Sequence, residues 1–368
     1  MSIILFVIIL GVLVVSHEFG HFIVAKLFGM RVDEFGFGFP PRLFGYTWKG
    51  TLYSFNAIPF GGFVRIYGED ALEEGAVDTR PADSFTAKSR WKQAAVVVAG
   101  VCFNLILAWG LISSGYMLGL PMSLSQAPAG STLLDAKTVV TFVGPDSPAE
   151  KAGLQAGDEI VALSGAPDRK LEGSTPEAIQ QFIAATGGRE LTLTYRRGES
   201  LPRDAHLIPV VGIVPDKLAV GIAMDTVGTL QLGFFSSIVE GARTTAHLLQ
   251  ATAGALFGLI RSVFVGQANL DGVTGPVGLI GVVGDASALG FVYLLTLTAM
   301  ISVNLAVMNL VPFPALDGGR LLFILIEAVR RKEIRPRTSA TWNAAGFFAL
   351  ILLMAILTYG DVMKLVRG

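Results

Sequence analysis

The stretch from Ile3 to Phe28, IILFVIILGVLVVSHEFGHFIVAKLF, is the part of the sequence that decides the fold. It is long and apolar enough to cross a bilayer, which takes about 20 such residues. It nevertheless contains His17, Glu18 and His21, which are costly inside a membrane unless they have partners. A cleaved signal peptide would not need these residues, and no basic residue precedes the apolar run. We therefore expect a retained membrane helix that carries chemistry.

The pentapeptide His17-Glu-Phe-Gly-His21 is an H-E-x-x-H motif. On a helix, the i, i+4 spacing puts both imidazoles on one face, one turn apart, so that they can share one zinc ion. Glu18 would project beside the metal, where a carboxylate can take a proton from an attacking water molecule. The alternative is a chance match, and the cost of burying these side chains in a membrane argues against it.

A catalytic zinc usually has three protein ligands and one open position. The best candidate for the third ligand is Asp317, within Asn309–Gly319, NLVPFPALDGG. Two prolines end regular helix and two glycines allow a tight turn, so this carboxylate lies on broken backbone after an apolar run. The alternative is that Asp317 caps the following helix. The remaining histidines, His206 and His247, lie in a soluble region and in an amphipathic segment.

The whole chain has the composition of a membrane protein. Of its 368 residues, 52% are hydrophobic and 15% are charged, and the mean hydropathy is +0.59. The net charge of −1 excludes the basic footprint of a nucleic-acid-binding protein. The only cysteine is Cys102, so no intrachain disulfide can form. Apolar runs predict four membrane spans, at 3–28, 94–120, 291–311 and 344–360.

Basic residues between the spans predict the orientation of the chain. Three of them between 88 and 92 precede the second span, and a larger cluster from Arg320 to Arg337 separates the third span from the fourth. These loops should be cytoplasmic, so both termini and everything between the second and third spans should face outward. The candidate metal ligands then meet near the cytoplasmic side.

Residues 35–67, between the first two spans, are rich in glycine and aromatic residues. Alternation around a turn-like Lys49-Gly50 predicts a β-hairpin. Because it is too apolar for an ordinary loop, we expect it to be re-entrant, dipping into the membrane beside the helices. The part around 46–55 would then pair with an unwound substrate by strand addition. The alternative is a simple cytoplasmic hairpin. The acidic stretch 69–83 follows it.

The region between the second and third spans divides into two parts. Residues 126–215 have a soluble composition, with alternating strands and turns and one helix at 175–185. Residues 216–285 read as a helical linker, and its segment 230–265 is amphipathic. We expect this segment to lie at the membrane interface, because a fifth span would put the candidate metal ligands on opposite sides of the membrane.

HEFGH near the N-terminus and NLVPFPALDGG near the C-terminus resemble the paired motifs of the site-2 protease family of intramembrane metalloproteases, and most of all its bacterial regulator-of-sigma-E protease (RseP) type. The resemblance covers essentially the whole chain. It implies zinc ligation by His17, His21 and Asp317, with Glu18 as the catalytic base. It also implies cleavage of single-span proteins in the bacterial cytoplasmic (inner) membrane, commonly anti-sigma factors already trimmed by another protease, or signal-peptide remnants.

Asn104, Asn304 and Asn309 lie on or next to the spans. Either they form hydrogen bonds between helices, or they handle the unwound substrate backbone and the oxyanion of the transition state. Gly100 and Asn104 match a G-x-x-x-N-like element of the family. Related sequences often have proline after this glycine, where this chain has Val101.

The stretch Val143–Gly165, VGPDSPAEKAGLQAGDEIVALSG, resembles a PDZ domain of the bacterial protease type, with the pattern S-P-A-x-x-A-G-L-x-x-G-D-x-I. A tight helix–turn–strand corner is expected at Gly153, Leu154, Gly157 and Asp158. Such a domain either adds an extended peptide as a strand or filters substrates by size. The regulator-of-sigma-E protease carries two tandem PDZ domains, whereas this chain has room for one.

The sequence therefore predicts a polytopic α-helical membrane protein with about four transmembrane helices, a re-entrant β-hairpin and an inserted α+β PDZ domain. Membrane segments at 1–125 and 286–368, the second with its L-D-G motif at 316–318, flank the PDZ domain at 126–215 and the linker. The predicted function is intramembrane zinc endopeptidase. A non-catalytic PDZ-bearing adaptor with a structural metal would not need a base beside the histidines, and a transporter would need more spans or a repeat.

Overall fold

The computed structural model describes residues 1–69, 81–128, 131–165, 169–172, 175–198, 200–214, 217–266, 275–332 and 334–367. The chain forms two compact units, one made of 1–115 and 234–368 and the other of 116–233. Most of the acidic stretch predicted at 69–83 lies outside the described residues.

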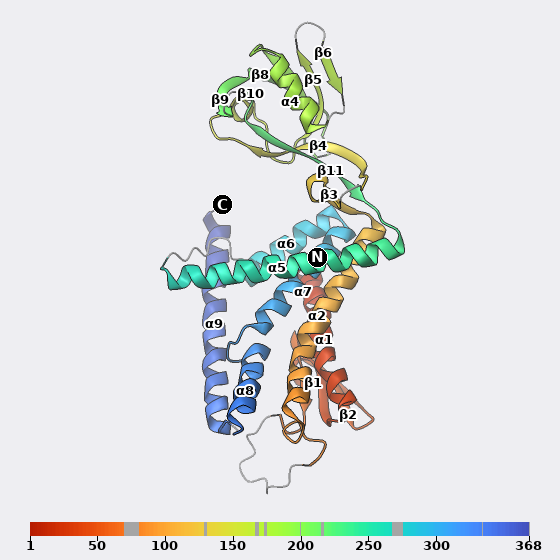
Figure 1. Ribbon diagram of the computed structural model, residues 1–368, viewed down its shortest axis with the longest axis vertical. Helices are drawn as coiled ribbons and strands as arrows, with labels where there is room; N and C mark the ends of the chain where they lie inside the picture. The colour runs from red at the N-terminus through yellow and green to blue at the C-terminus, as the bar shows by residue number, and fades with distance from the viewer. Residues whose placement is uncertain are drawn as a thin grey trace. The chain divides into compact units, whose positions relative to one another are not determined.

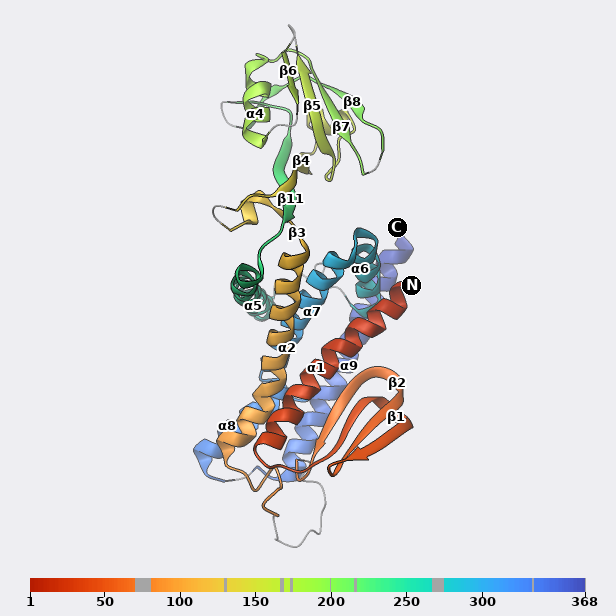
Figure 2. The ribbon, with the colours of Figure 1, turned by 90° about the vertical axis from the view of Figure 1, so that its right-hand side faces the viewer.

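The first unit consists mainly of apolar helices (Figures 1 and 2). They are α1 (Ser2–Leu27), α2 (Arg90–Leu118), α5 (Phe234–Phe264), α6 (Pro276–Leu289), α7 (Phe291–Leu310), α8 (Asp317–Arg330) and α9 (Pro336–Arg367). Among the described residues, α1, α2, α7 and positions 337–363 of α9 are long and apolar enough to cross a membrane. The prediction of four spans is confirmed. The fourth helix begins at 336, well before the expected 344.

Helix α5 runs across the long helices instead of along them (Figure 1). The face that packs against the unit is small and polar: Ser237 and Thr245 are buried, and Gly241 closely approaches Ser113 of α2. Bulky apolar side chains lie on its exposed side, among them Phe235, which is 82% exposed. This inside-out distribution is the one expected of a helix whose outer face contacts lipid.

A short sheet lies beside α1, formed by β1 (Val32–Trp48) and β2 (Thr51–Ile66). The predicted turn at Lys49-Gly50 is confirmed: both residues have positive φ, and Trp48 pairs with Thr51 across them. Two-residue turns with positive φ at both positions match the twist of antiparallel strands, which explains why the chain reverses here.

Both strands bend back on themselves, so the hairpin forms a sheet of four paired segments. The end of β1, at 42–48, pairs with 51–56; that segment pairs in turn with 34–37, and 32–37 pairs on its other side with 62–66. Residues 62–66 therefore form an edge strand, and among the described residues no strand pairs with their outer side.

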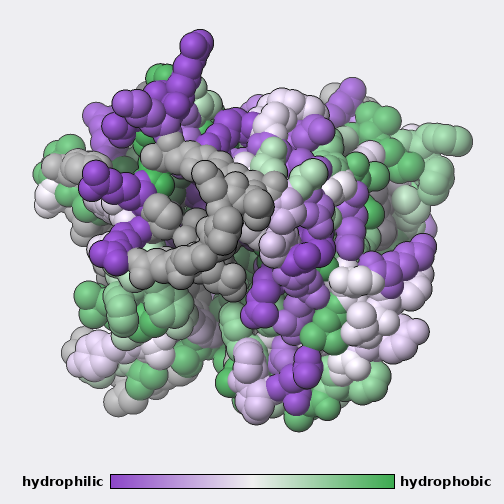
Figure 3. All heavy atoms as spheres, turned by 90° about the horizontal axis from the view of Figure 1, so that it is seen from below, coloured by the Kyte–Doolittle hydropathy of each residue, from purple (hydrophilic) through white to green (hydrophobic). Residues whose placement is uncertain are grey.

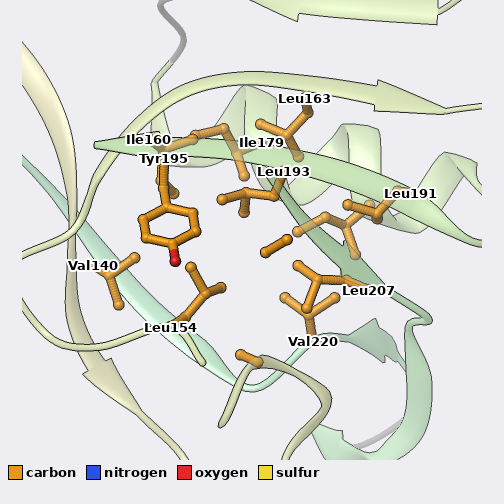
Figure 4. Packing of buried hydrophobic residues seen from close by; sticks show 13 residues of the cluster. Val140, Leu154, Ile160, Leu163, Ile179, Leu191, Leu193, Tyr195, Leu207 and Val220 are labelled. Carbon is orange, nitrogen blue, oxygen red and sulfur yellow. The ribbon is translucent and has the colours of Figure 1, made fainter. Parts of the chain in front are cut away.

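In its described residues, the second unit is an antiparallel sheet with two α-helices and one 3-10 helix, η1 (Leu124–Gln126). The order is β3 (Leu120–Ser123), β11 (Ile222–Leu230), β4 (Leu134–Val143), β5 (Glu159–Gly165), β7 (Leu191–Arg196) and β8 (Arg203–Leu207), with β6 (Arg169–Glu172) on β5 and a separate pair of β9 (Val210–Val214) and β10 (Lys217–Ala219). Helices α3 (Pro148–Lys151) and α4 (Pro176–Ala185) complete it. Ile179 of α4 packs into one apolar core with Leu163, Leu193 and Leu207 from the strands (Figure 4).

The predicted domain boundaries at 126 and 215 are wrong. The compact unit runs from 116 to 233, because β11 pairs with β4 from Ile222↔Val143 to Thr229↔Leu134 and β3 pairs with the end of β11. The segment 216–285 is correspondingly not one helical linker, since it contains β10, β11, α5 and α6. A strand whose partner lies about 80 residues earlier leaves no local signal that separates it from a linker.

An ion pair between the buried Asp158 and the partly exposed Arg197 stabilises the corner of the second unit. The carboxylate of Asp158 is fully buried and accepts hydrogen bonds from Arg197 Nε (2.7 Å) and Nη2 (2.8 Å) and from the Gln155 N–H (2.9 Å). Arg197 Nη2 also donates to the Gly153 carbonyl. Burial pushes the pKa of Asp158 upward, but the hydrogen bonds from Arg197 and Gln155 outweigh it, so the pKa lies below its usual value.

Acid should therefore weaken the second unit through Asp158. A carboxyl whose pKa is lowered by folding contributes stability above its unfolded pKa of about 4, and the contribution disappears as the pH falls through the lower, folded pKa. Hydrogen exchange of the 116–233 peptides in the full-length protein in detergent should show protection decreasing below pH 4, and Asp158→Asn should be less protected at pH 7 but less acid-sensitive. Parallel pH profiles for the two proteins would contradict this assignment.

Candidate metal centre

The two histidines of the H-E-x-x-H motif face one point. Both are on α1, one turn apart, with ring centroids 4.8 Å apart and ring planes at 82°. Their Nε2 atoms lie 3.2 Å from each other, and each side chain is about one-eighth exposed. Two imidazole nitrogens this close, both pointing away from the helix, form half of a metal site.

Asp317 completes the cluster from the other end of the chain. Its Oδ2 lies 2.9 Å from His17 Nε2 and 3.3 Å from His21 Nε2. It is the first residue of α8, and the residue at the N-cap position is Leu316, which has no side-chain capping bond. The Asp317 side chain thus turns toward the histidines, and the predicted alternative of a helix-capping aspartate does not describe this structure.

The three ligand atoms fit a zinc ion. With bonds of about 2.0–2.1 Å at tetrahedral angles, neighbouring ligand atoms lie about 3.3 Å apart. The three separations here are 2.9, 3.2 and 3.3 Å. The buried Asp317 Oδ2 has no hydrogen-bond donor of suitable geometry among the described residues, which is the arrangement expected of an oxygen that faces a cation.

Two glycines after Asp317 make the preceding loop possible. A Cβ on Gly318 would collide with the carbonyl of Val311, and one on Gly319 with the carbonyl of Phe313. The loop that ends α7 therefore folds directly onto the first turn of α8. The D-G-G sequence provides both the carboxylate and the space that its position requires.

Glu18 lines the same cavity as the three candidate ligands. This cavity has a volume of about 310 Å³, and its lining includes His17, Glu18, His21 and Asp317. One wall of the cavity is the edge strand of the hairpin, residues 62–66. Gly62 belongs to this wall, and a Cβ there would lie 3.4 Å from Glu18 Cγ. Sequence reasoning assigned substrate pairing to the part around 46–55, but the structure places 62–66 at the cavity.

Residues of helix α2 contact the Nδ1 atoms of both imidazoles. His21 Nδ1 lies 2.8 Å from the Val96 carbonyl oxygen, which can only accept, so this nitrogen carries a proton. In the neutral imidazole, Nε2 then has the lone pair that a metal requires. His17 Nδ1 lies 3.2 Å from the amide of Asn104. The Val96 carbonyl was missed from sequence, because a backbone acceptor has no residue signature.

Close approach of α1 and α2 depends on two glycines. A Cβ on Gly20 would lie 2.5 Å from the Ala99 carbonyl oxygen. A Cβ on Gly100 would lie 2.7 Å from His17 Cε1 and closer still to His21 Nε2. Gly100 is buried against the imidazoles and leaves room for them, and its predicted part in substrate handling stays a prediction.

The three asparagines have different surroundings. Asn104 is 0% exposed, and its predicted role in handling the substrate stays a prediction. Asn304 is exposed, and its Oδ1 accepts a hydrogen bond from Thr252 of α5 at 3.2 Å, which matches the interhelical alternative. Asn309 is half-buried near the end of α7. Gly153, Leu154, Gly157 and Asp158 lie together at the corner between α3 and β5 in the second unit.

Two histidines and a glutamate on a helix apolar enough to cross a membrane, together with the carboxylate of Asp317 at the start of α8, are the ingredients of a membrane-embedded metalloprotease. The model of peptidase family M50 matches residues 5–353, and the chain belongs to this family of site-2 type metalloproteases. The zinc metalloprotease RasP of Oceanobacillus iheyensis is 29% identical over 99% of both chains. RasP of Shouchella clausii is 28% identical over 98% of both, and a Clostridium perfringens relative provisionally named a zinc metalloprotease is 34% identical over 95% of both.

Proposed function

We propose that this chain is a zinc endopeptidase that hydrolyses peptide bonds within the transmembrane segments of single-span proteins, with His17, His21 and Asp317 as the ligands and Glu18 as the general base. The observation that carries the proposal is the cluster of three ligand atoms, at most 3.3 Å apart, on helices of a membrane protease family. When bound, zinc supplies a Lewis acid that activates water and polarises the scissile carbonyl.

The residues of the chain do the remaining work. Glu18 lies in the cavity with the ligands, where its carboxylate accepts the proton of the attacking water and passes it to the leaving amine. Substrate must present an unwound backbone, because a helix hides its carbonyls in its own hydrogen bonds. The edge strand 62–66 offers replacement partners by strand addition, directly beside Glu18. Asn309, half-buried near the end of α7, is proposed to handle the oxyanion or the unwound segment.

We place the protein in the bacterial cytoplasmic membrane with the metal centre near the cytoplasmic side. Figure 3 shows hydrophilic side chains in patches between hydrophobic ones at this end of the molecule. Exposed basic residues lie in and beside the α8–α9 connection: Arg330, Arg331, Lys332, Arg335 and Arg337. Such clusters mark cytoplasmic loops. Both termini and residues 116–233 then face outward.

The hairpin and α5 are proposed to contact lipid. Phe44, Tyr46 and Trp48 lie on the edge segment 42–48 of the hairpin and are 69%, 62% and 53% exposed. This exposure supports a re-entrant position in which these rings contact acyl chains. The exposed apolar face of α5, together with Arg243 and Arg261, supports a helix that lies in the membrane interface.

The second unit is proposed to be a single PDZ domain. Support comes from the corner at Gly153 and Gly157, both with positive φ, and from the buried Leu154 and Asp158 that follow the helix–turn–strand pattern. Its task is to bind a chain end or to exclude substrates with a large outer domain. The substrate class that fits is a single-span anti-sigma factor trimmed by another protease, or a signal-peptide remnant.

Metal removal tests the proposal. The purified full-length protein should contain one zinc per chain and cleave a model single-span substrate in detergent. Dialysis against a chelator should abolish cleavage, and stoichiometric zinc should restore it. Cleavage that persists in metal-free protein would contradict the mechanism. One zinc per chain without any cleavage would favour the non-catalytic adaptor with a structural metal.

A further inference from the structure

Asn104 is the only side chain, among those the structure describes, that hydrogen-bonds to His17 from α2. It is 0% exposed, and its Nδ2 lies 3.2 Å from His17 Nδ1. Its Oδ1 is also buried but has no hydrogen-bond partner in the described structure. Buried polar atoms are nearly always paired, so this unpaired oxygen points to a partner that the amide is built to meet.

The partner of the Asn104 oxygen is the proton that His17 carries on Nδ1 when it binds a metal. An imidazole that binds a metal through Nε2 must carry its proton on Nδ1, and that N–H needs an acceptor. His21 has such an acceptor in the Val96 carbonyl. For His17 the neighbouring amide must provide the acceptor, and an amide NH2 group cannot accept.

A half-turn of the Asn104 amide satisfies both groups. The oxygen and nitrogen of an amide are nearly equal in size, so exchanging them leaves the packing unchanged. Oδ1 then accepts from His17 Nδ1–H, which gives the unpaired oxygen a donor. The lone pair of His17 Nε2 is left free for a metal held together with His21 Nε2 and Asp317 Oδ2.

We infer that Asn104 is a positioning residue: its side-chain oxygen holds His17 in the Nδ1–H tautomer and in the ring orientation that metal ligation requires. The inference rests on the proposed zinc site. It gives the two imidazoles matched supports on α2, a backbone carbonyl for His21 and a side-chain carbonyl for His17. The backbone carbonyl of Asn104 itself accepts from the buried Ser302 of α7 at 2.7 Å, a contact that does not involve the amide.

Zinc affinity of the full-length protein in detergent, measured by competition with a chromophoric chelator, tests the inference. Asn104→Leu keeps the volume but removes the acceptor, so zinc should bind about 10- to 100-fold more weakly. Asn104→Asp keeps an acceptor oxygen at the same place and should bind zinc within about threefold of wild type or more tightly. Ser302→Ala removes the adjacent buried hydrogen bond, so it should lower the Tm without changing zinc affinity.

The outcomes separate this inference from the proposed function. A wild-type protein that binds no zinc would overturn the metal site itself. A wild type that binds zinc, with Asn104→Leu within threefold of it, would overturn only the role of Asn104. Equal weakening in the Leu and Asp variants would also overturn it, because the acceptor would then not matter. Should the Leu variant fail to fold, more than tenfold weakening in the Asp variant alone would overturn the inference, and retained affinity would support it.

Discussion

Glu18→Gln is expected to retain one zinc per chain and to cleave a single-span substrate about 10²- to 10⁴-fold more slowly than wild type. Glutamine has the shape of glutamate but cannot take a proton from water. Because the three ligand atoms belong to His17, His21 and Asp317, the substitution leaves the metal-binding set intact. The measurement is zinc content together with initial cleavage rate on the same purified samples.

A matched control is Glu240→Gln on α5, where the carboxylate pairs with Arg243 outside the cavity. It should keep both zinc and wild-type turnover. Equal turnover in Glu18→Gln and wild type would show that another group takes the proton. Loss of zinc in Glu18→Gln would instead mean that the carboxylate helps to hold the metal.

Gly100→Ala is expected to disrupt the metal centre although it adds only one methyl group. The new Cβ would lie 2.7 Å from His17 Cε1 and closer to His21 Nε2, so either α2 moves away or both rings rotate. Overpacking of this kind typically costs about 1–3 kcal/mol. Misplacement of a reacting group by about 1 Å costs on the order of 100-fold in rate, so kcat/KM should fall by at least about that factor, with weaker zinc binding.

Gly110→Ala is the control on the same helix, because nothing lies within 4 Å of a Cβ added there. It should keep zinc affinity and activity, and it has the same gain in helix propensity as Gly100→Ala. Comparing the two variants therefore separates the collision with the imidazoles from any general effect on α2. Wild-type zinc affinity in Gly100→Ala would show that the helices separate without disturbing the ligands.

Sequence alone determined the features that depend on neighbouring residues. Length and hydropathy fixed the four spans, since crossing a bilayer needs only a run of apolar residues. The i, i+4 spacing put His17 and His21 on one helical face. Lys49-Gly50 fixed the hairpin turn, because positive φ at two positions is a local preference.

Only the tertiary structure decided which distant segments meet. The sequence had already predicted Asp317 as the third ligand, but only the fold placed its Oδ2 2.9 Å from His17 Nε2. The fold also placed the strand 62–66 at the cavity and paired β11 with β4. The structure also shows that Gly100 and Asn104, which were expected to handle the substrate, pack against the imidazoles. Periodicity and turn preferences describe a chain over a few residues, whereas these contacts depend on how whole helices and strands pack, which no short pattern encodes.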